Sequence, residues 1–247
     1  MRSPRRHRRS GRAPPVPLNP GSQRPIRAVL FDAGNTLVFL DYARIADRVS
    51  VALGISLSAD QLISHASAAA QAMERAGSDQ ERASAYLEAL FLAAGVPAQR
   101  LPEVRATLIA LHQEKHLWCS VPPETRDALQ RLQAAKFQLG VVSNSEGRVS
   151  EALEAAGLRQ YFDVIVDSGL VGIEKPNPRI FEIALREIGV EPDEAIYVGD
   201  LYDVDILGAR AAGIEGVLLT TTDPAGPCRT IATIKEMADD LLAGEAP

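Results

Sequence analysis

The chain has 247 residues, of which 46% are hydrophobic and 23% charged, with 18 glycines and 16 prolines. These proportions are typical of a globular protein and exclude a collagen, a coiled coil and a wholly disordered chain. No uncharged apolar run approaches the roughly 18 to 20 residues needed to cross a bilayer. We therefore expect a cytoplasmic protein with no membrane partner.

The first 25 residues differ in composition from the rest of the chain. They hold seven arginines and no acidic residue, which leaves 19 basic against 32 acidic side chains in the remainder. This stretch is rich in Pro, Ser and Gly and lacks apolar periodicity, so residues 1–25 are predicted to form a disordered basic tail. Because an acidic body repels nucleic-acid phosphates, we expect no specific nucleic-acid partner.

From Ile26 onward, short apolar runs that end in a polar residue alternate with helical patterns. The runs are β-branched and almost continuously hydrophobic, as in strands that are covered on both faces. They comprise Arg27 to Phe31, Phe137 to Val142, Val164 to Val166, Ala195 to Val198, and Gly216 to Leu219. This alternation predicts an α/β fold with a doubly wound, Rossmann-like parallel sheet.

Between the first two strands, residues 40–118 show helical spacing only and contain no strand candidate. Four apolar stripes begin at Ile45, Leu62, Tyr86 and Leu101. Capping-box spacing occurs in two pairs, Ser58 with Gln61 and Ser78 with Glu81. We expect residues 40–118 to form an inserted four-helix cap, and residues 26–39 and 119–247 to form the α/β core. A cap at this point would cover the carboxyl ends of the strands, where open α/β sheets bind ligands.

Two helices of the core have recognisable ends. Asn177 is placed to cap a helix that stops at Gly189. Asn144 or Ser145 is expected to cap the helix that runs to Gly157, which would aim its free amide groups at the end of the preceding strand. Such a helix start attracts anions.

Chemistry-bearing side chains recur near the ends of the predicted strands. They are Asp32 in AVLFDAGNTL, Ser143 in VVSNS, Lys175 in GIEKPNP, and Asp200 with Asp205 in VGDLYDVD. An Asp at one strand end can simply cap a turn. Unrelated turns would seldom produce all of these residues in this order, so the set predicts one functional site.

With these motifs the sequence resembles the haloacid dehalogenase-like hydrolases, in the subgroup with a small all-helical cap inserted after the first motif. The family's four motifs are a nucleophilic Asp, a Ser or Thr, a Lys, and an acidic cluster of the GDxxxxD kind. All four are present, and the resemblance covers almost the whole stretch from Ile26 to Leu242. It implies Mg²⁺-dependent hydrolysis of a small phosphorylated substrate through an aspartyl-phosphate. Oligomeric state is not indicated.

The resemblance also implies a role for each motif residue. Asp32 is the expected nucleophile. The residues expected to bind phosphate are Ser143, Asn144 and Lys175, and Ser143 and Lys175 are also expected to assist catalysis. The expected metal ligands are Asp32, the backbone carbonyl of Gly34, Asp200, and Asp205 either directly or through water. These groups suit phosphoryl transfer, which needs an in-line nucleophile, cations, and hydrogen-bond donors preset around the phosphoryl oxygens.

Position 34 departs from the family pattern. Phosphatases of this family usually carry a second Asp two residues after the nucleophile, which protonates the leaving oxygen and later activates the attacking water. This chain has Gly34 instead. Because general acid-base catalysis contributes about 10² to 10⁴ in rate, we expect slow chemistry on alkyl phosphates. Acyl or aryl phosphates would need this missing acid less. Alternatively, the cap or the substrate would supply the proton donor.

Other functions remain open. A binding or regulatory protein would hold a phosphorylated ligand with little or no turnover. Gly34 favours this function, whereas the retained Asp32, Lys175 and Asp200 favour an enzyme. A 2-haloacid dehalogenase also uses an Asp nucleophile, without a metal. It places an aromatic residue at position 34, however, and lacks the acidic GDxxxxD cluster. A phosphonate hydrolase would need a cap lysine soon after the first motif, whereas Lys115 lies at the far end of the predicted cap.

Three further residues lie near the predicted cap exit. His112 and His116 are four apart, as in HExxH zinc proteases, but Gln113 stands where the general-base Glu is required. We interpret them as two exposed histidines. Trp118 is interpreted as a hinge or packing residue at the return to the core.

Overall fold

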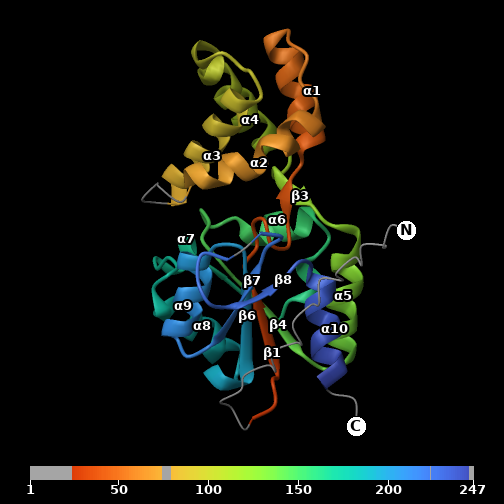
Figure 1. The fold of residues 1–247 in the computed structure, drawn as a ribbon, viewed down its shortest axis with the longest axis vertical. Coiled ribbons are helices and arrows are strands. Elements are labelled where there is room, and N and C mark those ends of the chain that lie inside the picture. Colours follow the sequence, from red (N-terminus) through yellow and green to blue (C-terminus); the bar gives the residue numbers. More distant parts are fainter. Residues whose placement is uncertain (1–23, 74–78, 223, 245–247) are drawn as a thin grey trace, which may run out of the picture.

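A six-stranded parallel sheet lies at the centre of the fold in the computed structural model, which describes residues 24–73, 79–222 and 224–244 (Figure 1). The strands are β1 (Ala28–Phe31), β4 (Gln138–Ser143), β5 (Val164–Asp167), β6 (Ala195–Gly199), β7 (Glu215–Leu219) and β8 (Arg229–Ile231). Their order in the sheet is β5-β4-β1-β6-β7-β8. The predicted doubly wound α/β fold is confirmed. β8 was not predicted, because this three-residue edge strand holds an arginine and a threonine and forms no apolar run.

Helices cover both faces of the sheet. Those of the core are α5 (Pro123–Ala134), α6 (Val149–Ala155), α7 (Ser168–Val171), α8 (Pro178–Ile188), α9 (Leu207–Ala211) and α10 (Ile234–Gly244). Val29 and Phe31 of β1 belong to the hydrophobic cluster of α5, α6 and α10, whereas Ala28 and Leu30 belong to that of α8 and α9. Figure 1 shows these two layers on opposite sides of the strands. β1 is therefore buried on both faces, as its continuous hydrophobicity predicts.

The predicted ends of α8 are confirmed. The side chain of Asn177 accepts a hydrogen bond from the amide of Arg179, at 3.1 Å. Gly189 ends the helix with a φ of 77°, a left-handed conformation that glycine adopts without steric cost.

The prediction that Asn144 or Ser145 caps the following helix is wrong. α6 begins at Val149, and Arg148 is its N-cap residue. The carboxylate of Asp167, at the end of the neighbouring strand β5, accepts the amide hydrogen of Val149 at 2.9 Å. The α6 amide is thus satisfied from another strand, and local sequence spacing cannot show such a contact.

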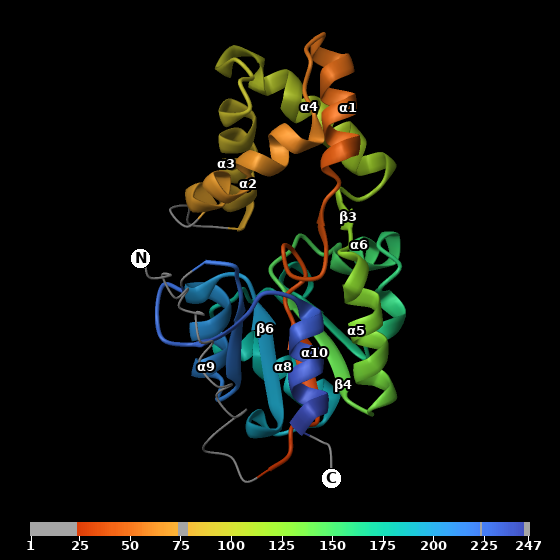
Figure 2. The same ribbon diagram turned by 45° about the vertical axis from the view of Figure 1, so that its right-hand side comes forward.

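Four helices and a two-stranded ribbon lie between β1 and α5. The helices are α1 (Tyr42–Leu53), α2 (Ala59–Met73), α3 (Asp79–Ala93) and α4 (Leu101–Glu114), and the ribbon pairs β2 (Phe39–Leu40) with β3 (Trp118–Ser120). The helices share a hydrophobic cluster of their own, and Figure 2 shows them beyond the carboxyl ends of the sheet strands, linked to the core through the ribbon. The ribbon was not predicted, since β2 has only two residues.

Short helical turns complete the structure. They are η1 (Ala98–Arg100), η2 (Arg159–Tyr161), η3 (Pro192–Glu194) and η4 (Tyr202–Ile206). The capping box of Ser58 and Gln61 is confirmed by reciprocal hydrogen bonds of 2.8 and 3.2 Å. Ser78 and nearly all of the predicted basic tail lie outside the described residues. Among the helices of the described ranges, none is long and apolar enough to span a membrane.

Candidate active site

Three sheet strands deliver polar residues to one edge of the sheet. Asp32 directly follows β1, Ser143 ends β4, and Asp200 directly follows β6. β1 lies between β4 and β6, at the point where the strand order reverses, which is where open α/β sheets bind ligands. The amide of Asp32 donates to the carbonyl of Val198 at 2.8 Å and so extends the β1–β6 ladder by one residue. Asp32 is therefore held rigidly at this edge.

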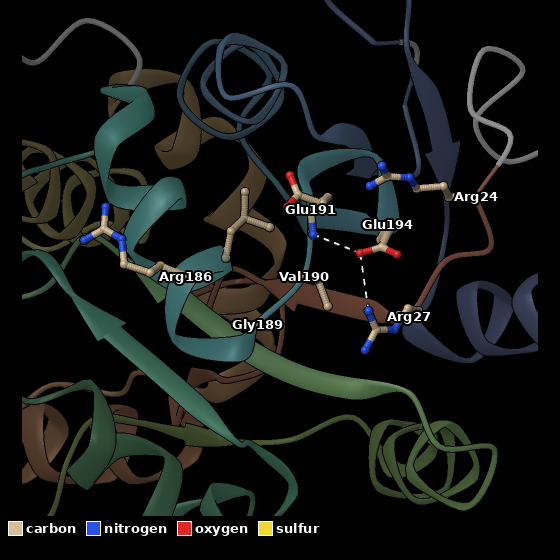
Figure 3. A pocket seen from close by; sticks show the side chains of 8 residues that line it. Arg24, Arg27, Arg186, Gly189, Val190, Glu191 and Glu194 are labelled. Carbon is tan, nitrogen blue, oxygen red and sulfur yellow. Dashed lines mark hydrogen bonds and ion pairs between the residues drawn. The ribbon is translucent and has the colours of Figure 1, made fainter.

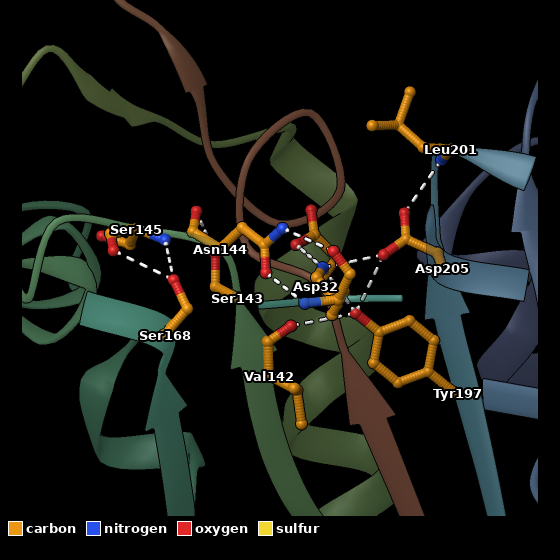
Figure 4. Close-up of polar contacts among 10 residues, drawn as sticks. Asp32, Val142, Ser143, Asn144, Ser145, Ser168, Tyr197, Leu201 and Asp205 are labelled. Carbon is orange, nitrogen blue, oxygen red and sulfur yellow. Dashed lines mark hydrogen bonds and ion pairs between the residues drawn. The ribbon is translucent and has the colours of Figure 1, made fainter. Parts of the chain in front are cut away.

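Lys175 lies at the centre of a buried polar cluster beside Asp32. Figure 4 shows Asp32, Tyr197 and Asp205, the three residues of this cluster that it labels around the lysine, close to one another. Its Nζ is 2.6 Å from Asp32 Oδ1, 2.7 Å from Asp205 Oδ1 and 2.9 Å from the hydroxyl of Tyr197. These acceptors use all three hydrogens of the ammonium group. Asp32 and Lys175 are 7% and 4% exposed, so solvent screens their attraction poorly.

Asp205 is built into this cluster from the turn η4. Its Oδ2 accepts the amide hydrogen of Leu201 at 2.9 Å, and its Oδ1 lies 3.1 Å from the Tyr197 hydroxyl. A Cβ on Gly199 would collide with the Asp205 carboxyl group. The close packing of Asp205 against β6 therefore requires a glycine at position 199. Asp205 is 1% exposed and is not an exposed acid at a helix start, whereas Asp203 in the same turn is exposed.

Carboxylate oxygens of Asp32, Asp200 and Asp205 lie within 4.8 Å of one another. Burial raises the pKa of Asp32 to about 6, although the nearby Lys175 ammonium lowers it. Burial, followed by the negative charges of Asp32 and Asp205, raises the pKa of Asp200 well above its ordinary value. One lysine thus faces three carboxylates, which leaves an excess of negative charge.

This donor set fits a hard divalent cation. Mg²⁺ prefers oxygen ligands and is usually held by one or two carboxylates together with water. Both oxygens of Asp205 already accept hydrogen bonds, from Lys175 and Leu201. Asp32 and Asp200 are therefore the better candidates for direct contact.

The structure places Ser143 and Asn144 beside this cluster but engages them differently. Ser143 is buried on the strand next to Asp32, and its hydroxyl makes only a long contact of 3.5 Å with the carbonyl of Asn144. The side chain of Asn144 accepts the Lys175 amide hydrogen at 2.8 Å and donates to the Lys175 carbonyl at 3.1 Å. Asn144 thus fixes the backbone of the lysine, and its side chain is not directed at a ligand.

Two residues that the sequence analysis did not single out support the site. Tyr197, fully buried on β6, donates to the Val142 carbonyl at 2.9 Å and accepts from Lys175. Asp167 accepts the amide hydrogens of Gly147 and Gly169, both at 3.0 Å, in addition to that of Val149. The sequence held a signal for each residue. Tyr197 places a hydroxyl within a continuously apolar strand, and Asp167 is an acid that follows a buried apolar run.

The turn after β1 brings Gly34 against an aromatic ring. Asn35, with a φ of 54°, donates its amide hydrogen to the Val38 carbonyl at 2.9 Å and closes this turn. A Cβ added to Gly34 would lie 3.6 Å from Cζ3 of Trp118, an ordinary van der Waals distance. The indole of Trp118 therefore faces the space that a side chain at position 34 would enter.

The interpretation of His112 and His116 as exposed residues is wrong. Both are half-buried and pack edge-to-face, with ring centroids 4.4 Å apart. His112 Nε2 lies 3.4 Å from a carboxylate oxygen of Glu146, which follows β4, and His116 Nδ1 accepts the Trp118 amide hydrogen. The pair therefore connects the end of α4 with the loop after Ser143.

A separate hollow of about 510 Å³ lies among α8, the turn η3 and the segment that leads into β1 (Figure 3). Arg24 and Arg27 line it, at the amino end of the sheet. Their guanidinium groups pair with Asp193 at 3.5 Å and Glu194 at 3.4 Å. Because it lies at the opposite end of β1 from Asp32, this hollow is not part of the candidate active site.

Comparison with known proteins decides the family. A model of the haloacid dehalogenase-like hydrolases matches residues 26–213. The chain belongs to this family. This hydrolase is 33% identical over 201 residues to a glyceraldehyde 3-phosphate phosphatase of Methanopyrus kandleri, covering 78% of this chain and 83% of the relative. It is 34% identical over 168 residues to a phosphoserine phosphatase of Thermus thermophilus, covering 66% of this chain and 65% of the relative.

Solved structures share the fold of this hydrolase but differ in their activities. A haloacid dehalogenase-like (HAD) phosphatase from Thermococcus onnurineus aligns with a TM-score of 0.57 and 24% identity, over 89% of this chain and 99% of that one. A 2-haloacid dehalogenase from Pseudomonas syringae aligns with a TM-score of 0.53 and 24% identity, over 90% and 100%. Since one fold serves both chemistries, the function must be argued from the site.

Proposed function

We propose that this hydrolase is a Mg²⁺-dependent phosphatase that acts on a small phosphorylated metabolite, with Asp32 as the nucleophile. The observation that carries the proposal is the convergence of Asp32, Asp200 and Asp205 with Lys175 at one sheet edge. The two curated relatives named above, both called phosphatases, support the same reaction class.

The charges of the cluster suit a phosphoryl group. Asp32 must be ionised to attack phosphorus, and the ammonium of Lys175 at 2.6 Å favours that ionised form. Mg²⁺ held by Asp32, Asp200 and the Gly34 carbonyl would neutralise charge on the phosphoryl oxygens. Asp205 instead positions Lys175, because its carboxylate is already hydrogen-bonded within the protein.

The reaction then proceeds in two displacements. A carboxylate oxygen of Asp32 forms a bond to phosphorus while the bond to the leaving oxygen breaks, which gives an aspartyl-phosphate. Water then attacks phosphorus, releases inorganic phosphate and restores the carboxylate. For Lys175 to donate to a phosphoryl oxygen, one of its three present contacts must be released, and the neutral Tyr197 hydroxyl is the weakest of these acceptors. Ser143 and the backbone amide of Asn144 would donate further hydrogen bonds to the phosphoryl oxygens.

Two other functions make distinct predictions. A phospholigand-binding or regulatory protein is favoured by Gly34, which removes the usual proton donor, and it would bind a phosphorylated ligand without releasing phosphate. A 2-haloacid dehalogenase has no use for a cation. It is therefore opposed by the three converging carboxylates of Asp32, Asp200 and Asp205.

A panel of phosphorylated metabolites tests the proposal, with phosphate release measured in Mg²⁺ and in EDTA. We expect Mg²⁺-dependent release that is lost in Asp32→Asn and retained in Asp203→Asn, a matched change at an exposed aspartate. Release that persists in Asp32→Asn would show that the nucleophile is misassigned. Mg²⁺-dependent binding of a phosphorylated ligand without release would support the binding protein instead.

A further inference from the structure

We propose that Trp118 contacts the leaving group of the substrate and that this group is aromatic, so that the substrate is a phosphate ester of an aryl alcohol. The inference rests on the proposed phosphatase function and specifies its substrate class. Its starting point is the close approach of the indole to Gly34, which lies two residues after Asp32.

The indole occupies a defined place. A Cβ on Gly34 would meet three ring carbons of Trp118, at 3.6, 3.7 and 3.9 Å. Trp118 pairs with Leu40 in the ribbon between β2 and β3, and its amide donates to His116 Nδ1 at 3.2 Å. Its side chain packs against the hydrophobic clusters of both the core and the cap helices. The ring is thus held in place before any ligand arrives.

The ring also lies within reach of the reacting atoms. Consecutive Cα atoms are about 3.8 Å apart, so Gly34 lies at most about 7.6 Å from Asp32 along the chain. Trp118 is only half-buried and keeps part of its surface accessible. A substituent on a phosphoryl group at Asp32 can therefore extend along the glycine to the indole. Aromatic groups pack well against such a ring, in offset-stacked or edge-to-face geometry.

The chemistry at position 34 favours the same class of substrate. Gly34 offers no carboxyl group to protonate the leaving oxygen. An aryl alcohol leaves as its anion with a conjugate-acid pKa of about 10, as in tyrosine, whereas an alkyl alcohol resembles water, which is a far weaker acid. Hydrolysis of an aryl phosphate ester therefore depends less on the missing acid at position 34 than hydrolysis of an alkyl phosphate ester does.

The first step can be written without a protein acid. An Asp32 oxygen donates an electron pair to phosphorus, and the bond between phosphorus and the aryl oxygen breaks with its electron pair on that oxygen. The aryloxide departs and takes a proton from solvent. Hydrolysis of the aspartyl-phosphate by water then gives the carboxylate and dihydrogen phosphate. No oxidant, reductant or second substrate is required.

A kinetic comparison of Trp118 variants tests the specificity role. The quantity of interest is the ratio of kcat/KM for phenyl phosphate to kcat/KM for glycerol 3-phosphate. An aromatic contact is worth about 0.5–1.5 kcal/mol, so Trp118→Leu should lower this ratio roughly two- to tenfold. Trp118→Phe should restore most of it.

Leu117→Ala provides the matched control for damage to the packing around Trp118. Leu117 is buried in the hydrophobic cluster of the cap helices, one residue before Trp118. Its truncation should lower hydrolysis of both esters by the same factor and leave the ratio unchanged. An unchanged ratio in Trp118→Leu would overturn the proposal and reduce Trp118 to a packing residue.

Fluorescence gives a second test that does not depend on turnover. Trp118 is the only tryptophan of the chain. In Asp32→Asn with Mg²⁺, 4-nitrophenyl phosphate should shorten the Trp118 fluorescence lifetime in a saturable way, and inorganic phosphate should reverse the effect. Free 4-nitrophenol at equal concentration serves as the control for collisional quenching. If 4-nitrophenyl phosphate binds and is displaced by inorganic phosphate, but the Trp118 fluorescence lifetime does not change, the proposed contact with Trp118 is refuted.

The two proposals fail in different ways. If wild-type protein releases phosphate through Asp32 but the ratio is insensitive to Trp118→Leu, only the aryl specificity is wrong. If no phosphate ester is hydrolysed in an Asp32-dependent manner, the phosphatase function itself is wrong.

Discussion

Lys175 Nζ lies 2.6 Å from Asp32 Oδ1, and both side chains are buried. Burial alone lowers the pKa of the lysine, but the charges of Asp205 and Asp32 outweigh this effect and raise it above its ordinary value. The ammonium in turn opposes the rise in the pKa of Asp32 that burial causes. Each group therefore keeps its partner charged, and the nucleophile stays available near neutral pH.

Removal of this lysine should destabilise the fold strongly at alkaline pH. In Lys175→Met, buried Asp32 and Asp205 lose their counter-charge, a change that typically costs about 3–5 kcal/mol. The pKa of Asp32 should then rise above its present value of about 6, so the loss should be largest at pH 8 and smaller at pH 5, where the carboxyl group is protonated. Urea unfolding at the two pH values measures the difference.

Lys235→Met is the control for this variant. Lys235 is half-exposed and pairs with Asp239 on the same helix, a type of ion pair worth at most about 1 kcal/mol. Equal losses of stability in the two variants would show that the buried ion pairs of Lys175 stabilise the fold no more than an exposed ion pair does.

Addition of Mg²⁺ should stabilise the folded chain. A ligand that binds only the native state at 100 times its Kd adds about 2.7 kcal/mol. We expect a rise in Tm that is reduced in Asp200→Asn and preserved in Asp203→Asn, because the first residue lies in the carboxylate cluster and the second is exposed. Differential scanning calorimetry with and without Mg²⁺ measures both. An equal rise in the two variants would remove Asp200 from the metal site.

Asp167→Asn should loosen the loop after Ser143. The Asp167 carboxylate accepts three backbone amide hydrogens, including those of Gly147 and Val149, and an asparagine would turn a donor NH₂ group toward some of them. Loss of such buried contacts costs about 1–3 kcal/mol. Hydrogen exchange should therefore accelerate at Gly147 and Val149. Asp163→Asn is the control, because Asp163 is exposed and accepts the Leu139 amide; similar acceleration at Gly147 in this variant would contradict the assignment.

Gly34→Asp should raise turnover of alkyl phosphates. The backbone of Gly34 lies outside the left-handed region, and a Cβ there meets Trp118 only at ordinary contact distance. A proton donor is worth about 10² to 10⁴ in rate when well placed, and the nearby indole limits its placement, so we expect a gain of about tenfold or more. Gly34→Asn has nearly the same shape without the acid. An equal gain in that variant, or none in Gly34→Asp, would contradict this account of the defect.

His116 should make the protein less stable in mild acid. Burial, followed by the charges of His112 and Arg148, lowers its pKa from 6.5 to about 4. Between these values the unfolded chain binds a proton that the folded chain does not, so the free energy of unfolding falls as pH falls from about 6.5 toward 4. For a half-buried group we expect an effect of about 1 kcal/mol.

Unfolding of wild type and His116→Asn at pH 7.5 and 5.0 isolates this effect. Asparagine can still accept the Trp118 amide hydrogen but does not titrate. The variant should lose less stability than wild type on acidification. An identical loss would show that His116 does not account for it.

Local pattern was sufficient to predict much of the core. Apolar runs that end at Asp32, Ser143 and Asp200 predict parallel strands, and parallel strands place their carboxyl ends at one edge. Convergence of these residues therefore follows from the fold class. The ends of α8 were predictable for a similar reason, because capping at Asn177 involves only its near neighbours.

The remaining features depend on contacts between segments far apart in the chain. The Tyr197 hydroxyl meets Lys175, Asp167 replaces the predicted cap of α6, and Asn144 holds the backbone of Lys175. The indole of Trp118 lies against Gly34, 84 positions earlier in the numbering. Sequence periodicity reports the environment of a residue within its own helix or strand. Which side chains meet across elements is set by how those elements pack, and that packing is long-range.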